Sequence, residues 1–222
     1  VSVDGNAEGG VDLWDVGGAV TVKSVIVTDN ITDGVWLDGF GLSPTVNGGI
    51  ICANGYGTSV GYSVTVNVEG NWWGCSAGPG NPGCDVAEDY AGTMDYAPWI
   101  ESITATTTVS PVNAGDPTVV SFQFSAGDGS MFLGQGPGDL HGPPPFTLST
   151  SNGALTDADQ TATTIQEFIN RSNGVLEVTL VPLWGDTATV TLNGPCGLAS
   201  ELVVPVIGDP PNSIYLPLTM RN

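Results

Sequence analysis

Residues 71–85, which read N-W-W-G-C-S-A-G-P-G-N-P-G-C-D, decide how the rest of this chain is interpreted. Two adjacent tryptophans stand beside two cysteines, and glycine and proline fill most of the remaining positions. No helix survives that much Gly and Pro, and two large rings in a short loop need a broad surface to pack on. The segment therefore predicts an ordered end-piece of a β structure, stapled by a disulfide between Cys75 and Cys84. The alternative is a pair of free, buried thiols.

The chain is strongly acidic. Its 222 residues hold 3 Lys+Arg against 23 Asp+Glu, a formal net charge of -20. Binding to nucleic acid or to an anionic membrane surface requires cationic groups, so we expect neither as a partner. No apolar run approaches the ~20 residues that span a bilayer, so we expect no membrane insertion. With 41% hydrophobic residues the chain can still bury a core.

Four cysteines indicate a secreted, disulfide-containing protein. Cys52 and Cys196 are left once Cys75 and Cys84 pair, and they lie in different halves of the chain. They bridge two domains, bridge two subunits or stay free, and the sequence does not decide among these. Residue 1 is Val and no signal peptide precedes it, so we expect a mature or trimmed product of a longer chain at the bacterial cell surface or outside the cell.

Residues 1–70 contain short apolar runs separated by turns rich in Asn, Asp and Gly. Such runs, too short to pair locally as hairpins, predict the rungs of a parallel β-solenoid. The turn asparagines would then stack as amide ladders. The alternative is an antiparallel sandwich with Gly-rich loops. The expected strands lie at residues 10–14, 20–27, 34–38, 49–52 and 64–68.

A resemblance sharpens this interpretation. Residues 64–68, the N-W-W-G at 71–74 and the D-Y-A-P-W at 95–99 resemble the last rung and C-terminal closure of right-handed parallel β-helix proteins of the broad pectate-lyase-like group, found in secreted bacterial proteins. The resemblance covers residues 1–100 and implies a fold, without implying an activity. It also implies that Trp72 and Trp73 cover the last rung and that the Cys75–Cys84 loop pins this cover.

Residues 101–207 carry longer strands with turn signals between them, which predicts a β-sandwich. The segments T-V-S-P-V-N-A-G-D at 108–116 and L-S-T-S-N-G-A-L at 148–155 resemble bacterial Ig-like domains of the invasin/intimin type. Residues 162–170 fit a short helix or a strand. The expected strands lie at residues 103–109, 119–124, 146–149, 175–181, 187–192 and 201–206.

Residues 208–222 form a Pro-rich linker followed by an apolar tail strand. This tail is either the last strand of its own sandwich or a strand added to a neighbouring subunit. The predicted fold class is therefore all-β: a short right-handed parallel β-helix over 1–100, an Ig-like β-sandwich over 101–207, and the linker and tail strand over 208–222.

The chain offers little for catalysis. A β-helix lyase needs a cationic base, and Lys23 is the only Lys or Arg in the solenoid half. Asp29, Asp33 and Asp38 are candidates for the paired acids of a glycoside hydrolase, although turn acids are ordinary in a solenoid. His141, the single histidine, lies in a Gly/Pro loop and is expected to be exposed. We expect no catalytic residue and no enzyme.

Two other kinds of site are candidates. The acids Asp85, Glu88, Asp89 and Asp95 follow the cysteine loop closely enough to bind Ca²⁺, although their spacing matches no EF-hand. No other cofactor is expected. Asn30 and Asn170 begin glycosylation sequons.

The function expected from these features is structural. A solenoid that starts in a strand exposes unpaired backbone groups, which favours association with copies of itself, head to tail, into a filament or surface layer. The residues expected to carry this assembly are Val1, Val3, Ile214, Tyr215, Leu216 and Leu218.

Two alternatives remain open. The chain is the C-terminal fragment of a larger secreted β-helix that degrades polysaccharide or adheres to cells, or it is a carbohydrate-binding module. In the second case Trp14, Trp36 or Trp184 would stack on a sugar, with cell-surface polysaccharide as the partner. Burial in the core is the alternative for each of these tryptophans.

Overall fold

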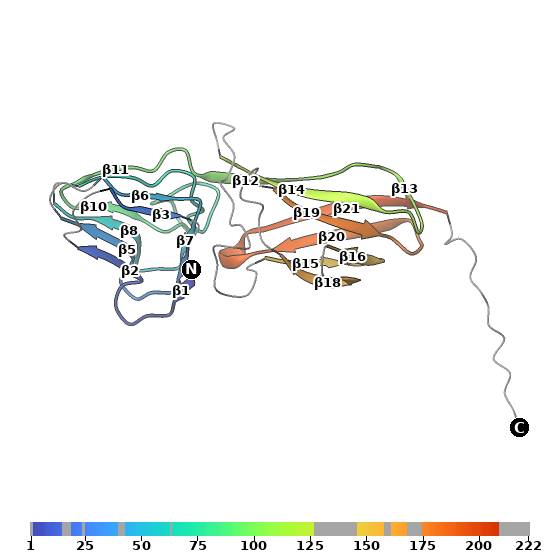
Figure 1. Cartoon of the computed structure of the whole chain (residues 1–222), viewed down its shortest axis with the longest axis horizontal. Helices are drawn as coiled ribbons and strands as arrows, with labels where there is room; N and C mark the ends of the chain where they lie inside the picture. The colour runs from blue at the N-terminus through green and yellow to red at the C-terminus, as the bar shows by residue number, and fades with distance from the viewer. Residues whose placement is uncertain are drawn as a thin grey trace, which may run out of the picture.

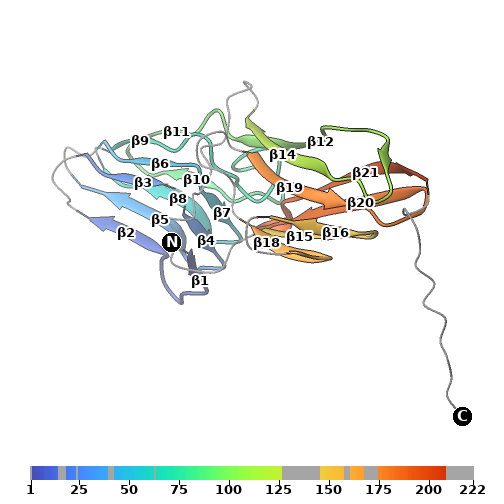
Figure 2. The same cartoon turned by 45° about the vertical axis from the view of Figure 1, so that its right-hand side comes forward.

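A computed structural model describes residues 2–14, 19–23, 25–39, 43–62, 64–126, 146–157, 161–167 and 175–208. These residues form strands, turns and a single short 3-10 turn, so the all-β prediction is confirmed. Two bodies lie end to end, a three-sided solenoid followed by a two-sheet sandwich (Figures 1 and 2). No helix among the described residues is long and apolar enough to cross a membrane.

The solenoid has about four rungs, and each complete rung places one strand on each of three sheets. Every pairing between rungs is parallel, which confirms the parallel β-helix and excludes the antiparallel alternative. Rung 1 is β1 (Ser2–Asp4), β2 (Val11–Trp14) and β3 (Thr21–Lys23). Rung 2 is β4 (Ile26–Thr28), β5 (Asp33–Asp38) and β6 (Thr45–Asn47). Rung 3 is β7 (Ile50–Cys52), β8 (Tyr56–Val60) and β9 (Thr65–Asn67). Rung 4 is β10 (Ala87–Asp89) and β11 (Thr93–Asp95), with Trp72 bridging to Ile50 in place of a third strand.

We call the three faces sheet A (β1-β4-β7), sheet B (β10-β8-β5-β2) and sheet C (β11-β9-β6-β3). Inward side chains of successive rungs stack over one another, because equivalent strands are in parallel register. Sheet A stacks Val3 on Val27 and Val27 on Ile51, and sheet C stacks Val22 on Val46. These columns make one continuous aliphatic core inside the solenoid.

One expected strand divides in two. Residues 20–27 read as a single apolar run, but β3 ends at Lys23 on sheet C and β4 begins at Ile26 on sheet A. The chain turns a corner between them without any glycine or asparagine to mark it.

The tryptophan pair does not cover the last rung, as the resemblance implied. Rung 4 follows it, and Trp73 is fully buried inside the solenoid core of that rung. Trp72 faces the opposite way and packs with the sandwich. The loop closed by the Cys75–Cys84 disulfide leaves the corner between Trp73 and β10. Trp99 covers the rung instead, since it packs on the core, its Nε1 donates to the Ser76 carbonyl over 3.1 Å, and a Cβ at Gly78 would lie 2.3 Å from its ring.

The second body has two five-stranded sheets, ordered β12-β14-β19-β16-β17 and β13-β21-β20-β15-β18. Their inner faces share one core, in which Phe122 and Phe124 of the first sheet pack with Leu148 and Val190 of the second. Residues 164–167, left open between helix and strand, form a strand. The elements are β12 (Ile100–Thr107), β13 (Val112–Asn113), β14 (Thr118–Ala126), β15 (Phe146–Thr150), β16 (Ala154–Thr156), β17 (Thr161–Ala162), β18 (Thr164–Glu167), β19 (Val175–Val181), β20 (Thr187–Asn193), η1 (Pro195–Gly197) and β21 (Ala199–Ile207).

The two bodies are joined by more than the chain between them. Ile26, Ile50 and Trp72 point outward from the solenoid on sheet A and belong to the core cluster of the sandwich. A disulfide links Cys52, at the end of β7, to Cys196 in η1 across a sequence separation of 144. Of the three fates left open for these cysteines, the structure has the bridge between domains. Sheet A is thus covered on both faces, whereas no described element packs on the outer face of sheet B or sheet C.

Several predicted residues lie outside the described part of the chain. They are Val1, His141, Asn170, the insert at 127–145, and the tail with Ile214, Tyr215, Leu216 and Leu218.

Candidate functional site

A column of asparagines runs along the corner between sheets A and B. Asn6 donates its Nδ2 to Asn30 Oδ1 over 2.8 Å, and Asn30 donates to Asn54 Oδ1 over the same distance, each step spanning 24 residues. Asn54 then donates to Asp85 Oδ2 over 2.8 Å. The expected amide ladder is therefore present, and all three of its steps point the same way, from rung 1 toward rung 4.

A left-handed residue precedes each asparagine of this ladder. Gly5, Asp29 and Ala53 have φ of 64°, 58° and 59°. This conformation turns the corner and aims the next side chain along the solenoid. Asn30 also donates to the Thr28 carbonyl over 3.1 Å, and Asn54 to the Cys52 carbonyl over 3.2 Å. The ladder therefore satisfies backbone carbonyls at the corner as well as neighbouring amides.

Asp85 ends the ladder with an acceptor. Both of its carboxylate oxygens also lie 3.2 Å from the backbone N–H of Asn54, which donates to them. Burial raises the pKa of Asp85, and the hydrogen bonds from Asn54 lower it by a smaller amount. A carboxylate suits this place because it accepts and, when ionised, has nothing to donate onward.

A column of glycines makes room for the ladder. A Cβ at Gly34 would lie 2.6 Å from the Gly57 carbonyl oxygen and 2.8 Å from Asn54 Nδ2. A Cβ at Gly10 would lie 2.5 Å from the Gly34 carbonyl oxygen and 2.9 Å from Asn30 Nδ2. Glycine is required here by close approach, because a side chain would displace the amide of the next rung.

Rung 1 is open on its outer side. Its inward side chains Val3, Val11, Leu13 and Val22 are each half-buried, whereas the rung 2 residues beneath them are fully buried. Strands β1, β2 and β3 each stand at the edge of their sheet. Among the described residues, nothing donates to Asn6 Oδ1 at the start of the ladder. Within the described part of the chain, the features that hold two rungs together recur on this surface without a partner.

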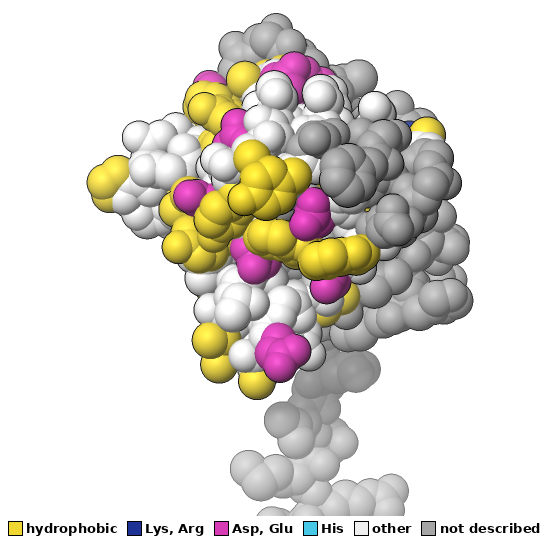
Figure 3. Space-filling model, turned by 90° about the vertical axis from the view of Figure 1, so that its left-hand side faces the viewer, with side chains coloured by type: hydrophobic (Ala, Val, Ile, Leu, Met, Phe, Trp, Pro, Cys, Tyr) yellow, Lys and Arg dark blue, Asp and Glu magenta, His cyan; other side chains and the backbone are white. Residues whose placement is uncertain are grey.

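A second feature lies on the outer face of sheet B. The rings of Trp36 on β5 and Tyr90 after β10 approach with centroids 5.7 Å apart and tilted by 52°. Tyr56, at the start of β8, lies beside them and is paired in register with Asp33. We call Trp36, Tyr56, Tyr90, Asp33 and Glu88 the aromatic–acid cluster. Figure 3 looks onto the side of the solenoid that lies farthest from the sandwich. On this side, hydrophobic side chains alternate with carboxylates.

The four acids considered for calcium are not brought together. Asp85 is buried in the asparagine ladder, Glu88 and Asp89 lie on β10, and Asp95 ends β11 on a different sheet. No group of three His, Cys, Asp or Glu side chains able to hold a metal ion occurs in the described residues. Proximity in sequence was misleading, because the corner between β10 and β11 separates these carboxylates.

The acids considered for glycoside hydrolysis are also separated. Asp33 and Asp38 stand at the two ends of β5, which puts them roughly 16 Å apart at about 3.3 Å per strand residue. Paired glycosidase acids need a gap of about 5 to 9.5 Å. Asp33 instead accepts a hydrogen bond from the Ser59 hydroxyl. Asp29 occupies the left-handed corner next to Asn30.

The sequon at Asn30 does not present its side chain. Asn30 is 2% exposed, and its Nδ2 is committed to Asn54 and to backbone carbonyls. The amide that a glycan would modify is therefore inside the ladder.

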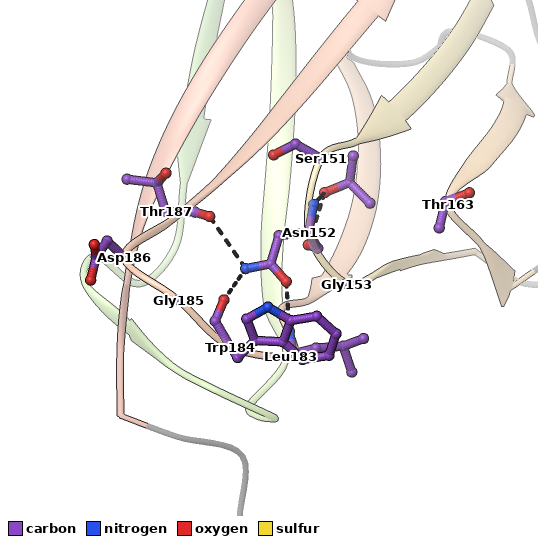
Figure 4. Close-up of a pocket in the computed structure, with 10 residues that line it drawn as sticks. Ser151, Asn152, Gly153, Thr163, Leu183, Trp184, Gly185, Asp186 and Thr187 are labelled. Atoms are coloured by element: carbon purple, nitrogen blue, oxygen red, sulfur yellow. Dashed lines mark hydrogen bonds between the residues drawn. The ribbon is translucent and has the colours of Figure 1, made fainter.

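Two of the three candidate stacking tryptophans are exposed, contrary to the core alternative. Trp14 is 67% exposed on β2 and Trp184 is 60% exposed in the turn before β20. Trp184 borders a shallow pocket with Leu183 and Asn152 (Figure 4). Asn152 donates to the carbonyls of Trp184 and Thr187 and accepts from the backbone N–H of Leu183. This amide staples the turn to the neighbouring loop, so the polar groups of the pocket serve the fold.

Comparison with known proteins adds little to this picture. No family model matches the chain, and no curated protein matches it in sequence. Among solved structures, domains 4 and 5 of the S-layer protein SbsC match with a TM-score of 0.34 and 17% identity, over 52% of this chain and 57% of that one. The chain spans a little over half the length of that structure, and the function has to be argued from the residues described above.

Proposed function

We propose that this chain is a non-enzymatic structural subunit of an extracellular assembly and that rung 1 is its joining surface. The observation that carries the proposal is the open rung: three edge strands, four half-buried inward side chains and an unpartnered ladder acceptor lie on one surface. A partner rung of the same three-sided shape would satisfy all of them together. The partner we propose is another copy of this chain.

The hydrophobic part of this surface is large enough to matter. The residues equivalent to Val11 and Leu13 in rung 2, Val35 and Leu37, are completely buried by the rung above them. A rung added outside rung 1 would bury Val11 and Leu13 in the same way, at about 25 cal/mol per Å² of apolar surface. Backbone hydrogen bonds along β1, β2 and β3 would fix the register of the added rung on rung 1.

The negative charge of the chain opposes this contact, so the contact depends on salt concentration. A net charge of -20 repels a second copy. Salt screens this repulsion, with a Debye length of about 8 Å at physiological ionic strength. We therefore expect assembly to increase with salt concentration, the opposite of an interface held by ion pairs.

The disulfides support an extracellular setting. All four cysteines are paired, one pair within the loop after Trp73 and one pair across the two bodies. Such bonds persist in oxidising compartments. The bridge between the bodies also suits a load-bearing subunit, because it keeps the sandwich fixed against sheet A.

Sedimentation velocity and electron microscopy of the 222-residue chain, over a salt series, test the proposal with a matched pair of variants. Val11→Asp places a charge on the joining surface, and Val203→Asp places the same charge on β21, where Val203 is already 52% exposed. We expect the wild type and Val203→Asp to associate into species larger than the monomer, and Val11→Asp to remain monomeric while melting cooperatively. Monomers of all three proteins at every salt concentration, or equal assembly of both variants, would refute it.

A longer polypeptide with further rungs ahead of rung 1 is the second candidate. The 24-residue period of the asparagine ladder favours it, because another asparagine would continue the column. The intact mass of the natural product distinguishes the two: a mass well above 22.6 kDa supports the longer β-helix.

A further inference from the structure

The aromatic–acid cluster on sheet B is separate from the joining surface and is not needed to hold the fold together. Tyr90 is 53% exposed and Tyr56 is 39% exposed, and Trp36 is half-buried. The inward residues on the same strands, Val35, Leu37 and Val60, already supply the core. Three aromatic side chains are thus gathered on an outer face against which no other described element packs.

Small residues on the middle strand bring the rings together. Trp36 belongs to rung 2 and Tyr90 to rung 4, with β8 of rung 3 between them. The outward residues of β8 and its end are Ser59 and Gly61. Ser59 is small, and the space over Gly61 is taken by the side chain of Asp38. The two rings therefore meet over β8, and Ser59 beneath them is fully buried. Their tilt of 52° makes an open wedge, in contrast to the flat platform formed by coplanar rings.

Carboxylates lie beside this wedge, and no Lys or Arg of the described residues neutralises them. Glu88 is paired with Ser59, and Ser59 with Trp36, so all three lie in one row across sheet B. Asp33 lies in the Tyr56 row. Lys23, the only Lys or Arg in the described part of the chain, is on sheet C.

The hydroxyl of Tyr90 reports the negative field at this place. Partial removal from water raises its pKa, and Tyr56 and the charges of Asp33 and Glu88 raise it further. A hydrogen bond with Tyr56 acts in the same direction, which is the effect expected when Tyr90 is the donor. The Tyr90 phenol therefore stays neutral, and its ring remains available to a ligand.

We propose that the aromatic–acid cluster binds an organic cation, specifically a quaternary ammonium group. The faces of Trp and Tyr rings attract such a group through their quadrupoles, and recognition of choline-like ligands by aromatic cages is the best-known use of this interaction. Glu88 and Asp33 supply the opposite charge. Because the two rings already pack on each other, with centroids 5.7 Å apart, the methyl groups of the ligand pack on the exposed sides of the pair, where a small hydrated metal ion gains no such contact.

Other ligand classes fit less well. An anionic sugar or a phosphate would face two carboxylates with no cation to offset them. A neutral sugar ring stacks best on a flat aromatic surface, and it draws nothing from the uncompensated charge. The proposed ligand is therefore a positively charged ammonium group that carries no phosphate. A phosphate attached to that group should weaken binding.

The probe is choline chloride, titrated into ¹⁵N-labelled protein at constant ionic strength while the indole N–H resonances are followed by NMR. The neutral isostere 3,3-dimethylbutan-1-ol and phosphocholine are titrated in parallel. We expect choline to shift the Trp36 resonance saturably in the millimolar range, the isostere to shift it at least fivefold more weakly, and phosphocholine to bind more weakly than choline.

Variants separate the cluster from non-specific effects. Trp36→Leu and Glu88→Gln should each raise the Kd for choline at least threefold, followed through the remaining shifted resonances, and Tyr90→Phe should leave it nearly unchanged. Trp184→Leu, at the exposed tryptophan of the sandwich, is the matched control and should bind choline like the wild type.

Three results would overturn the proposal: equal binding of choline and its neutral isostere, tighter binding of phosphocholine, or a choline response that survives Trp36→Leu unchanged. Saturable binding of neutral oligosaccharides at Trp36, without binding of choline, would also reject it in favour of a sugar site. The assembly of the chain through rung 1 is unaffected by any of these outcomes.

Discussion

Asn54 donates its side-chain Nδ2 to Asp85 Oδ2 over 2.8 Å, and this bond ends a ladder of amides that runs through the solenoid. The carboxylate stops a column in which Asn30 and Asn54 each accept from the asparagine before them and donate to the next residue. At the other end, Asn6 leaves an acceptor free among the described residues. The ladder therefore has a direction, with a finished end at rung 4 and an unfinished end at rung 1.

Substitutions of Asp85 separate its charge from its hydrogen bonds. Asp85→Asn keeps an acceptor for Asn54 and removes the cost of burying a charge, so at pH 7 we expect unchanged stability or a gain of up to about 1 kcal/mol. Asp85→Ala removes the acceptor of the Asn54 backbone N–H and one acceptor of its side-chain amide, and should cost about 1–3 kcal/mol. Urea unfolding measures both. Equal losses for the two variants would mean that the hydrogen bonds of the ladder contribute nothing.

The same pair predicts a pH dependence. The pKa of Asp85 in the folded protein is raised above its ordinary value of 3.8, so the folded state holds more protons than the unfolded state between the two values. The contribution of Asp85 to stability is thus fully present below pH 3.8 and is lost as pH rises through the raised value. The unfolding free energy of the wild type minus that of Asp85→Asn should therefore fall as pH rises. A difference that rises with pH would contradict it.

The glycine column predicts a contrast between two alanine substitutions. Gly34→Ala places a Cβ 2.6 Å from a backbone carbonyl and 2.8 Å from the Asn54 amide, so the ladder must shift. The variant should lose about 2 kcal/mol or more. At Gly9 the nearest atom to an added Cβ is 3.5 Å away, which is ordinary contact. Gly9→Ala should therefore unfold at nearly the wild-type urea concentration, and a similar loss in both would refute the steric argument.

Ala53 predicts a stabilising substitution. Its φ of 59° is left-handed, where a Cβ costs about 1–2 kcal/mol, and the equivalent residue in rung 1 is Gly5. Glycine at residue 53 removes this cost but gains freedom in the unfolded chain, worth about 0.5–1 kcal/mol. We expect Ala53→Gly to raise the melting temperature slightly and Ala7→Gly, at an exposed alanine without positive φ, to lower it. A lower melting temperature for Ala53→Gly would contradict this account.

The bridge between Cys52 and Cys196 predicts a large effect. It closes a loop spanning 144 residues, so removing it frees much of the unfolded chain. The double alanine variant should lose about 3–5 kcal/mol against denaturant. A Cys75–Cys84 double alanine variant is the comparison, since its separation is 9 and the expected loss is smaller. Equal losses would show that loop size does not govern the effect.

The sequence predicted the solenoid because turns with Asn recur along it. In the structure, each asparagine of the ladder follows a left-handed residue, and the pairs read Gly-Asn, Asp-Asn and Ala-Asn in the sequence. Sequence reasoning missed the corner between β3 and β4, which carries no glycine or asparagine. It kept the boundary at residue 100 but identified residues 64–68 as the last rung, one rung too early, because the cysteine loop resembles a terminus when it is an insertion at a corner. The fate of Cys52 was open for the same reason: pairing depends on how sheet A meets the sandwich.

The candidate site was only partly predictable. Trp36 was proposed as a stacking residue, but Tyr56 and Tyr90 were not, since their approach depends on the register of β5, β8 and β10. The small size of Ser59 and Gly61 is visible in the sequence. Its consequence for Trp36 and Tyr90 is seen only once the rungs on either side of β8 are known. Conversely, the four acids at 85–95 looked clustered because sequence distance says nothing about corners.

The central claim is that rung 1 is the joining surface, and hydrogen–deuterium exchange on the 222-residue chain tests it most directly. Backbone amides in β1, β2 and β3 are followed as protein and salt concentrations increase, with β12 at the edge of the sandwich as the reference. The account predicts slower exchange in all three rung 1 strands as assembly proceeds, with β12 unchanged. Rung 1 amides that exchange at the monomer rate under every condition, or protection gained at β12 instead, would contradict it.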